Sequence, residues 1–246
     1  MEKDIYDKIS KSKREGKKLF AVLIDPDKFD SMEVIENANK AAVDLIMVGG
    51  SLLSNGNFEK CIETLKAASK IPVIIFPGNN LQISPKADGI LLLSLISGRN
   101  PELLIGKHVV AAPLLRSSKL EILPTGYMLI ESGKQTTALY MSNTHPIPYD
   151  KDDIAACTSL AGELLGLKLI YMDGGSGAMK TISESMIKKV SSTISIPLII
   201  GGGINSDEKA MKACKAGADV IVVGNAIEND VSLIESISKA VHSFNN

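Results

Sequence analysis

The sequence predicts an α/β protein built as one (β/α)8 barrel, the TIM barrel, of the phosphate-binding type. Short runs rich in Val, Ile and Leu alternate with longer amphipathic segments, a pattern typical of buried parallel strands that are covered by helices. The chain has 246 residues, and one such barrel typically needs about 250. We therefore expect a single domain over residues 1–246.

The strands of this barrel are predicted from eight short apolar segments. Each segment is bounded by charged or turn-forming residues, as expected for strands of a parallel sheet. Eight is also the number of strands that a closed barrel of this class requires. The predicted strands are residues 19–24, 44–48, 72–76, 88–93, 126–131, 168–172, 197–200 and 219–223.

Helical patterns lie between the strands, but the third helix is missing from the pattern. Only a short segment separates the third and fourth strands, and Pro85 interrupts its residues 81–87, so this helix is absent or reduced to a turn. Its loss predicts a gap in the outer wall of the barrel. Pro101 and Ser206 are residue types that favour helix starts. The predicted helices are residues 31–41, 58–68, 101–117, 152–165, 179–190, 207–216 and 228–243.

Composition and charge exclude several classes of function. The net charge is −1 and no basic stripe with interleaved aromatics occurs, so nucleic acid is not an expected partner. No apolar run reaches the roughly 20 residues that a membrane helix needs, and the charged residues 1–18 lack the core of a signal peptide. Cys61, Cys157 and Cys214 have neither zinc nor disulfide spacing. We expect a cytoplasmic protein with reduced cysteines.

The first two strands are followed by residues that suit a metal ion. Reacting groups of a βα barrel lie at the C-terminal ends of its strands. Asp25 directly follows the first strand, and Ser51 follows Gly49 and Gly50 after the second. Mg²⁺ takes few protein oxygens and completes its shell with water and substrate phosphate, so one carboxylate and one hydroxyl suffice. The alternative for Asp25 is to cap the turn made by Pro26.

Glycine-rich loops after the last three strands predict a phosphate site. Backbone N–H groups of such loops, with the N-terminus of a short extra helix, form the anion site that these barrels place after strands 7 and 8. The alternative is that the glycines serve only tight turns, but they occur at three adjacent strand ends. The segments are Tyr171-Met172-Asp173-Gly174-Gly175-Ser176-Gly177, Gly201-Gly202-Gly203-Ile204 and Gly224-Asn225.

Asp173 precedes the first glycine run and is the candidate general base. It would take a proton from a hydroxyl of the phosphorylated ligand, or it would cap the turn that follows. Tyr171 would hydrogen-bond the same ligand, or it would be packed with a wet hydroxyl. Lys28 and Lys134 follow strand ends and would steer phosphate or stay solvated. The long loop 132–149 predicts an active-site cover or an interface element.

Together these segments resemble the geranylgeranylglyceryl phosphate synthase family, whose bacterial relatives include heptaprenylglyceryl phosphate synthase. The resemblance covers nearly the whole chain. It rests on Leu23-Ile24-Asp25-Pro26-Asp27-Lys28, Val48-Gly49-Gly50-Ser51, His145-Pro146-Ile147-Pro148, residues 171–178, Gly201-Gly202-Gly203-Ile204 and Val223-Gly224-Asn225.

The resemblance implies a prenyltransferase that joins geranylgeranyl (or longer polyprenyl) diphosphate to the 3-hydroxyl of sn-glycerol 1-phosphate, giving an ether-lipid precursor. Asp25 and Ser51 would hold Mg²⁺ against the diphosphate, Asp173 would be the base, and the gap at the third helix would accept the prenyl tail. It also implies a homo-oligomer that contacts membranes only transiently, through its lipid substrate. The residues implied to bind glycerol 1-phosphate are Tyr171, Met172, Asp173, Gly174, Gly175, Ser176, Gly177, Gly202, Gly203, Gly224 and Asn225.

Two positions depart from the pattern of the family. Many members carry Glu where this chain has Asp173, and the shorter side chain needs a water or a closer loop to reach the hydroxyl. Some bacterial relatives carry Lys where this chain has Leu23.

Other functions fit parts of the pattern. A sugar-phosphate isomerase or cyclase of the histidine-biosynthesis type also has a glycine-rich phosphate site, with carboxylates after the first and fifth strands, here Asp25 and Glu131. A Schiff-base aldolase fits worse, because Lys168 begins its strand and no lysine ends one. A non-catalytic sensor of phosphorylated metabolites would keep the same barrel. Mg²⁺-dependent release of diphosphate from a prenyl substrate would distinguish a prenyltransferase from the isomerase or cyclase. Catalytic turnover would distinguish an enzyme from the sensor.

Overall fold

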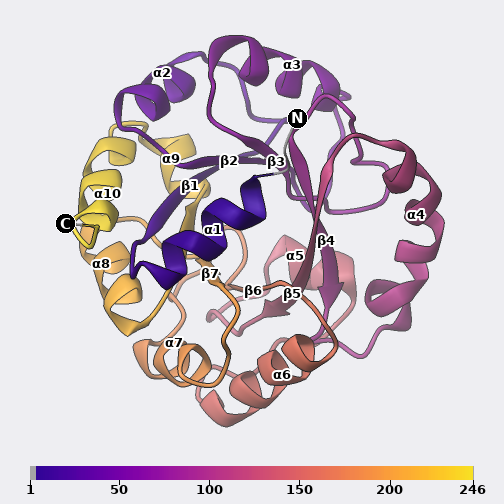
Figure 1. Ribbon diagram of the computed structural model, residues 1–246, viewed down its shortest axis with the longest axis vertical. Helices are drawn as coiled ribbons and strands as arrows, with labels where there is room; N and C mark the ends of the chain where they lie inside the picture. Colours follow the sequence, from indigo (N-terminus) through magenta and orange to yellow (C-terminus); the bar gives the residue numbers. More distant parts are fainter. Residues whose placement is uncertain (1–3, 246) are drawn as a thin grey trace.

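The computed structural model of the protein describes residues 4–245 and shows a closed barrel of eight parallel strands (Figure 1). Neighbouring strands pair in chain order, and pairing of β1 with β8, from Leu19 opposite Val220, closes the barrel. The predicted fold class is confirmed. The strands are β1 (Leu19–Ile24), β2 (Leu45–Val48), β3 (Val73–Ile75), β4 (Gly89–Leu95), β5 (Glu121–Leu129), β6 (Leu169–Asp173), β7 (Leu198–Gly201) and β8 (Val220–Val223).

Most strands begin and end close to the predicted positions, and β5 is the exception. It begins at Glu121 instead of the predicted residue 126, because it pairs with β4 from Gly89 onward. It ends at Leu129. Glu131 follows the strand, but it is exposed and is not among the residues that line the cavity at the strand ends, which weakens the isomerase alternative.

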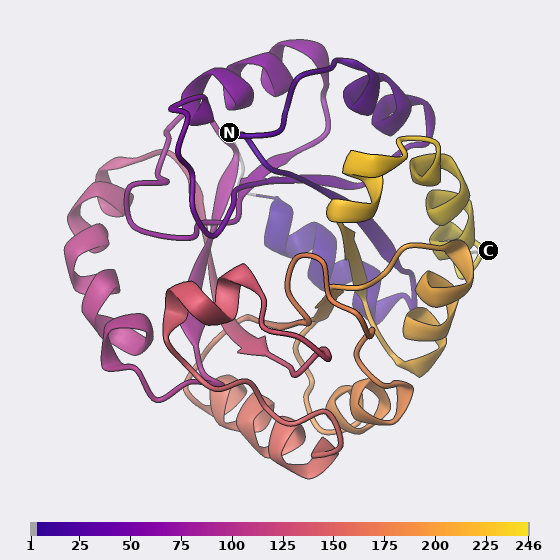
Figure 2. The ribbon, with the colours of Figure 1, turned by 180° about the vertical axis from the view of Figure 1, so that it is seen from behind.

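A ring of helices surrounds the barrel, and the short helices α5 and α9 lie over its C-terminal face (Figure 2). The predicted helix 228–243 is two helices, separated where the Asp230 carboxylate accepts a hydrogen bond from the Ser232 N–H. Within residues 4–245 the helices are α1 (Ile5–Arg14), α2 (Glu33–Lys40), α3 (Phe58–Ala68), the π-helix η1 (Glu102–Gly106), α4 (Lys107–Ser117), α5 (Thr137–Ser142), α6 (Asp152–Leu164), α7 (Glu184–Ser191), α8 (Asp207–Ala216), α9 (Asn225–Asn229) and α10 (Leu233–His242).

Serine caps mark the beginning of two helices. The Ser206 hydroxyl accepts a hydrogen bond from the Lys209 N–H at 3.3 Å, as the sequence predicts. The Ser183 hydroxyl accepts one from the Met186 N–H at 3.2 Å, so α7 begins after this serine and not at residue 179. A capping oxygen satisfies an N–H group that the first turn of a helix leaves free.

The helix predicted to be absent after β3 is indeed absent. Residues 76–88, all of them described, form turns and bends without a helix between β3 and β4. The buried Gln82 fixes this loop, because its Nε2 donates to the Gly50 carbonyl at 2.8 Å and its Oε1 accepts from the Gly78 N–H at 3.0 Å. The loop is therefore held against the end of β2 without a helix of its own.

Helix α1 closes the N-terminal end of the barrel (Figure 1). Ile5 and Ile9 are buried in the barrel interior, and the Glu121 carboxylate accepts hydrogen bonds from the Ile5 and Tyr6 N–H groups, each at 2.8 Å. This helix is not among those predicted from the sequence, where residues 1–18 show many charges and few apolar side chains. Two isoleucines one turn apart are enough to seat the helix.

Both faces of the strands are buried, which explains why they lack polar alternation. In β1, Ala21 packs inside the barrel, whereas Phe20 and Val22 pack between the barrel and the helices. The outward-facing side chains of the strands pack against the inward-facing side chains of the surrounding helices. Among residues 4–245, no helix combines the length and the apolar character that crossing a bilayer requires.

Candidate active site

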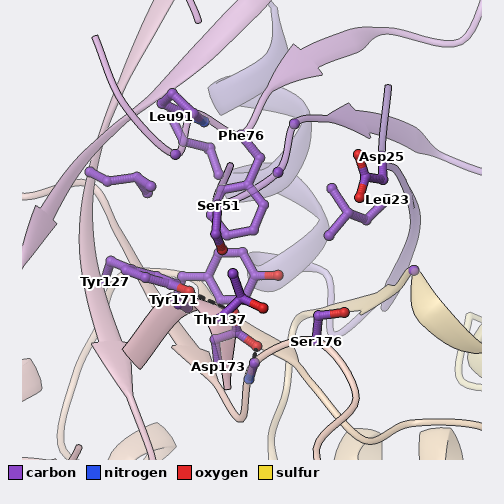
Figure 3. Close-up of a pocket in the computed structure, with 18 of the residues that line it drawn as sticks. Leu23, Asp25, Ser51, Phe76, Leu91, Tyr127, Thr137, Tyr171, Asp173 and Ser176 are labelled. Carbon is purple, nitrogen blue, oxygen red and sulfur yellow. Dashed lines mark hydrogen bonds between the residues drawn. The ribbon is translucent and has the colours of Figure 1, made fainter. Parts of the chain in front are cut away.

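A cavity of about 670 Å³ opens at the C-terminal ends of the strands (Figure 3). Its walls come from the ends of the first two strands and of the last three, so that Asp25, Ser51, Asp173 and Asn225 line one space. The residues predicted to hold a metal ion and those predicted to hold a phosphate therefore face a common cavity.

Asp25 lies at the rim of this cavity, in the turn that follows β1. Its Oδ1 accepts a hydrogen bond from the Asp27 N–H at 3.0 Å, and its Oδ2 lies 3.6 Å from the Lys28 Nζ. The side chain is 22% exposed. Burial raises the pKa of the carboxyl above its ordinary value, while the Asp27 N–H and Lys28 oppose that rise. Asp25 thus caps the turn and still presents an oxygen to a ligand.

The loop that carries Ser51 packs against Asp25 at Gly50, because glycines allow a close approach of three loops. A Cβ at Gly50 would lie 3.3 Å from Asp25 Oδ1, and one at Gly78 would lie 2.2 Å from the Gly50 carbonyl oxygen. Within the described part of the chain, no group of three or more His, Cys, Asp or Glu side chains is placed to hold a metal. An ion here would complete its shell with oxygens of a substrate and water.

The loops after β6, β7 and β8 form a glycine cradle, made of residues 174–178, 201–204 and 224–225. Gly175 has a φ of +83° and Gly202 one of +84°, a conformation that strongly favours glycine. A Cβ at Gly202 would lie only 2.5 Å from the Gly174 nitrogen. The cradle residues that line the cavity are Gly175, Ser176, Gly177, Ala178, Gly202, Gly203, Ile204, Gly224 and Asn225.

Two residues predicted to bind substrate support the cradle instead of lining it. Met172 is buried between the barrel and the helices, because its neighbours Tyr171 and Asp173 take the inward positions of β6. The Gly174 N–H donates to the Gly201 carbonyl at 3.1 Å, so it is already used in joining two loops. The segment as a whole reaches the cavity, but strand alternation divides its members between two faces.

Asp173 ends β6 with its carboxylate buried, at 7% exposure. Its Oδ2 accepts a hydrogen bond from the Tyr127 hydroxyl at 2.6 Å, and its Oδ1 accepts one from the Gly175 N–H at 2.7 Å. Burial raises the pKa of this carboxyl, and the two hydrogen bonds lower it in part. Asp173 therefore caps the glycine loop, as one of the two alternatives expected, and it also lines the cavity, where a base would have to lie.

Tyr127, which the sequence analysis did not single out, belongs to a cluster of three rings in the cavity wall (Figure 3). Phe76 and Tyr171 stack with centroids 5.1 Å apart, and Tyr127 lies edge-on to them at 5.6 and 5.5 Å. The predicted strand 126–131 placed Tyr127 at a strand start, far from the chemistry. The true β5 brings it opposite Tyr171, near the C-terminal end.

Two lysines bring positive charge to the rim. The Lys28 Nζ donates to Glu228 Oε2 at 2.8 Å and so bridges Asp25 and a carboxylate of α9 that the sequence analysis missed. The Lys134 Nζ lies over the glycine cradle, where it would be 3.1 Å from a Cβ at Gly177. Lys134 therefore stands next to the predicted phosphate position.

An apolar branch of the cavity runs through the place of the missing helix. Ile90 and Leu92 of β4 line it, together with Ala111 and Leu115 of α4. Part of the loop 76–88 also lines the cavity. The branch is continuous with the space that holds the carboxylates and suits a hydrocarbon chain.

A glycine cradle, a buried carboxylate and a pair of oxygen donors around one cavity define an enzyme of the phosphate-binding (β/α)8 barrel class. The profile of the PcrB family matches residues 10–242. The chain belongs to the PcrB family and is a prenyltransferase, which confirms the resemblance found in the sequence.

Relatives and solved structures agree with this assignment. The chain is 53% identical over 246 residues to a geranylgeranylglyceryl phosphate synthase of Chitinophaga pinensis, covering 99% of this chain and 98% of the relative. The enzyme of that name from Pyrococcus horikoshii is 41% identical over 241 residues, which are 96% of this chain and 92% of the relative. A crystal structure of (S)-3-O-geranylgeranylglyceryl phosphate synthase from Thermoplasma acidophilum, in complex with substrate sn-glycerol-1-phosphate, matches with a TM-score of 0.91 and 33% identity, covering 97% and 98% of the two chains.

Proposed function

We propose that the protein transfers a geranylgeranyl, or longer polyprenyl, group from its diphosphate to the 3-hydroxyl of sn-glycerol 1-phosphate. The observation that carries this proposal is the joining of three features in one cavity: the glycine cradle, the Asp25–Ser51 pair and the apolar branch. Its similarity to named geranylgeranylglyceryl phosphate synthases, one of them in complex with sn-glycerol-1-phosphate, supports these substrates.

In this proposal the glycine cradle holds the phosphate of glycerol 1-phosphate. Backbone N–H groups of the three loops would bind the phosphate oxygens, and the Lys134 amine over Gly177 would add a cation. The glycerol hydroxyls would then lie toward Asp173, because this residue ends the strand from which the cradle begins.

The Asp25–Ser51 pair fits a magnesium ion that is shared with the diphosphate. Carboxylate and hydroxyl oxygens are the hard donors that Mg²⁺ prefers, and both side chains line the cavity. When bound, Mg²⁺ would neutralise charge on the departing diphosphate. Lys28, which bridges Asp25 and Glu228, would lie beside the same diphosphate.

The reaction needs a proton acceptor, and Asp173 supplies it. As the 3-hydroxyl oxygen bonds to C1 of the prenyl group, the bond from C1 to the diphosphate oxygen breaks and its electron pair leaves with diphosphate. The proton of the hydroxyl passes to the Asp173 carboxylate. Burial raises the pKa of this carboxyl, which makes it a better acceptor than an exposed aspartate.

A product assay tests the proposal. Purified protein is incubated with sn-glycerol 1-phosphate, Mg²⁺ and prenyl diphosphates of several lengths, and extracted lipid is analysed by mass spectrometry. We expect a prenyl ether of glycerol phosphate, with one diphosphate released for each ether. If no prenyl diphosphate yields an ether product, the proposal is refuted. An undiminished rate in the Asp173→Asn variant would refute the role of Asp173 as the base.

We further propose a cytoplasmic homo-oligomer that contacts membranes only transiently, through its lipid substrate. The apolar side chains Val109, Val110 and Leu114 of α4 are 66%, 69% and 54% exposed. Apolar patches of this kind often mark contacts between proteins, and a second copy would cover them. Light scattering coupled to gel filtration measures the assembly, and a monomer at working concentration would contradict it.

A further inference from the structure

The hydrogen bond between Tyr127 and Asp173 joins two buried groups. Tyr127 is 9% exposed and Asp173 is 7% exposed, and the two oxygens are 2.6 Å apart. A short hydrogen bond from a neutral donor to a carboxylate is strong, and more so where water is excluded. We propose that Tyr127 is a positioning residue that fixes the Asp173 carboxylate for proton removal. This inference rests on the proposed function, in which Asp173 is the base.

The carboxylate of Asp173 is held at both oxygens. Oδ1 accepts the Gly175 N–H at 2.7 Å, while Oδ2 accepts the Tyr127 hydroxyl. Two donors on different strands and loops prevent rotation of the carboxylate about its last bond. Each oxygen keeps a further lone pair, so the group remains an acceptor for a substrate hydroxyl while its orientation is set.

Tyr127 is itself held in place and stays protonated. Its ring meets Phe76 at an interplanar angle of 77° and Tyr171 at 84°, the edge-on geometry that aromatic pairs favour. Burial, and then the charge of Asp173, raise the pKa of the Tyr127 hydroxyl well above its ordinary value. Tyr127 therefore remains a hydrogen-bond donor throughout the pH range in which Asp173 ionises.

The other groups around Asp173 do not duplicate this contact. The charge of Asp173 raises the pKa of two neighbouring hydroxyls, those of Tyr127 from β5 and Tyr171 from β6 itself. The Tyr171 hydroxyl packs against Gly201 of β7, where a Cβ would lie 2.6 Å from it. Phe76, from the end of β3, contributes only a ring. Tyr127 is thus the side chain that donates to this carboxylate.

The Tyr127→Phe variant tests the inference through the pH dependence of turnover. A base works in its ionised form, and the Tyr127 hydrogen bond lowers the pKa of Asp173. Its removal raises that pKa, so the acid limb of the kcat/KM profile should move to higher pH. We also expect kcat on the plateau to fall about 10- to 100-fold, as for loss of a hydrogen bond to a charged group, while KM for glycerol 1-phosphate stays near its original value.

Two comparisons separate positioning from packing. The Tyr6→Phe variant makes the same chemical change on the opposite face of the barrel and should leave the profile in place. In the Asp173→Asn background, Tyr127→Phe should cause little further loss, because the carboxylate that it positions is gone.

Each alternative outcome has a definite meaning. An unmoved acid limb in Tyr127→Phe, with product still formed by the parent protein, would overturn the inference and leave the proposed function standing. Unfolding of the variant, or loss of glycerol 1-phosphate binding in calorimetry, would show a packing role and would also overturn it. Full activity of Asp173→Asn would instead remove the base on which the inference rests.

Discussion

Gly202 offers a direct test of how the cradle is built, through the Gly202→Ala variant. Its φ of +84° lies in the left-handed region, where a side chain costs about 1–2 kcal/mol. The new Cβ would also lie 2.5 Å from the nitrogen and 2.7 Å from the Cα of Gly174. Backbone atoms do not move aside easily, and overpacking of this kind costs about 1–3 kcal/mol. We expect a loss of roughly 2–5 kcal/mol in unfolding free energy.

The Gly16→Ala variant is the matched control. Gly16 has a φ of +72°, and a Cβ there would have nothing within 4 Å. This variant carries the conformational cost without the overlap, and both variants share the same gain from a stiffer unfolded chain. The difference between the two in unfolding free energy therefore isolates the overlap.

Urea unfolding and calorimetry with glycerol 1-phosphate provide the measurements. Because the overlap pushes apart the loops after β6 and β7, we expect Gly202→Ala to weaken ligand binding about tenfold or more, a change of about 1.4 kcal/mol, and Gly16→Ala to leave it unchanged. Equal stability of the two variants, with unaltered affinity, would refute the idea that these loops bind phosphate through closely packed backbone.

Three further substitutions address the other parts of the cavity. Asp25→Asn should abolish the rise in melting temperature that Mg²⁺ and diphosphate cause together, with glycerol 1-phosphate affinity retained; a persisting rise would place the ion elsewhere. Lys134→Ala should raise KM for glycerol 1-phosphate by up to about fivefold, since an exposed charge contributes little, and the difference should shrink in high salt; an unaltered KM would leave Lys134 as solvated charge. Leu92→Trp should fill the apolar branch, so that turnover of long prenyl diphosphates falls while that of short ones persists; equal effects on all lengths would argue against a tail in this branch.

The two ends of the cavity were predictable because they depend on local features. Asp25 follows an apolar strand directly, and glycines cluster after three neighbouring strands. The closed barrel then brings these strand ends around one cavity by its topology alone. The missing third helix could be predicted for the same reason, because a short segment interrupted by Pro85 is visible in the chain itself.

The contacts that depend on register and side-chain direction were not predictable. Tyr127 was hidden because β5 pairs with all of β4 and so begins before its apolar run. Met172 was assigned to substrate because a motif does not show which residues of a strand point inward. Glu228 was missed because its approach to Lys28 joins the two ends of the chain across the closure between β1 and β8.

Helix α1 determines the direction in which ligands travel. Ile5 and Ile9 fill the N-terminal end of the barrel. Ligands therefore reach the cavity through its C-terminal mouth and the apolar branch. If the proposed function holds, spent diphosphate must leave through the same C-terminal mouth by which fresh substrate arrives. We expect added diphosphate to inhibit turnover in competition with the prenyl donor. We also expect release of the two products to be partly rate-limiting.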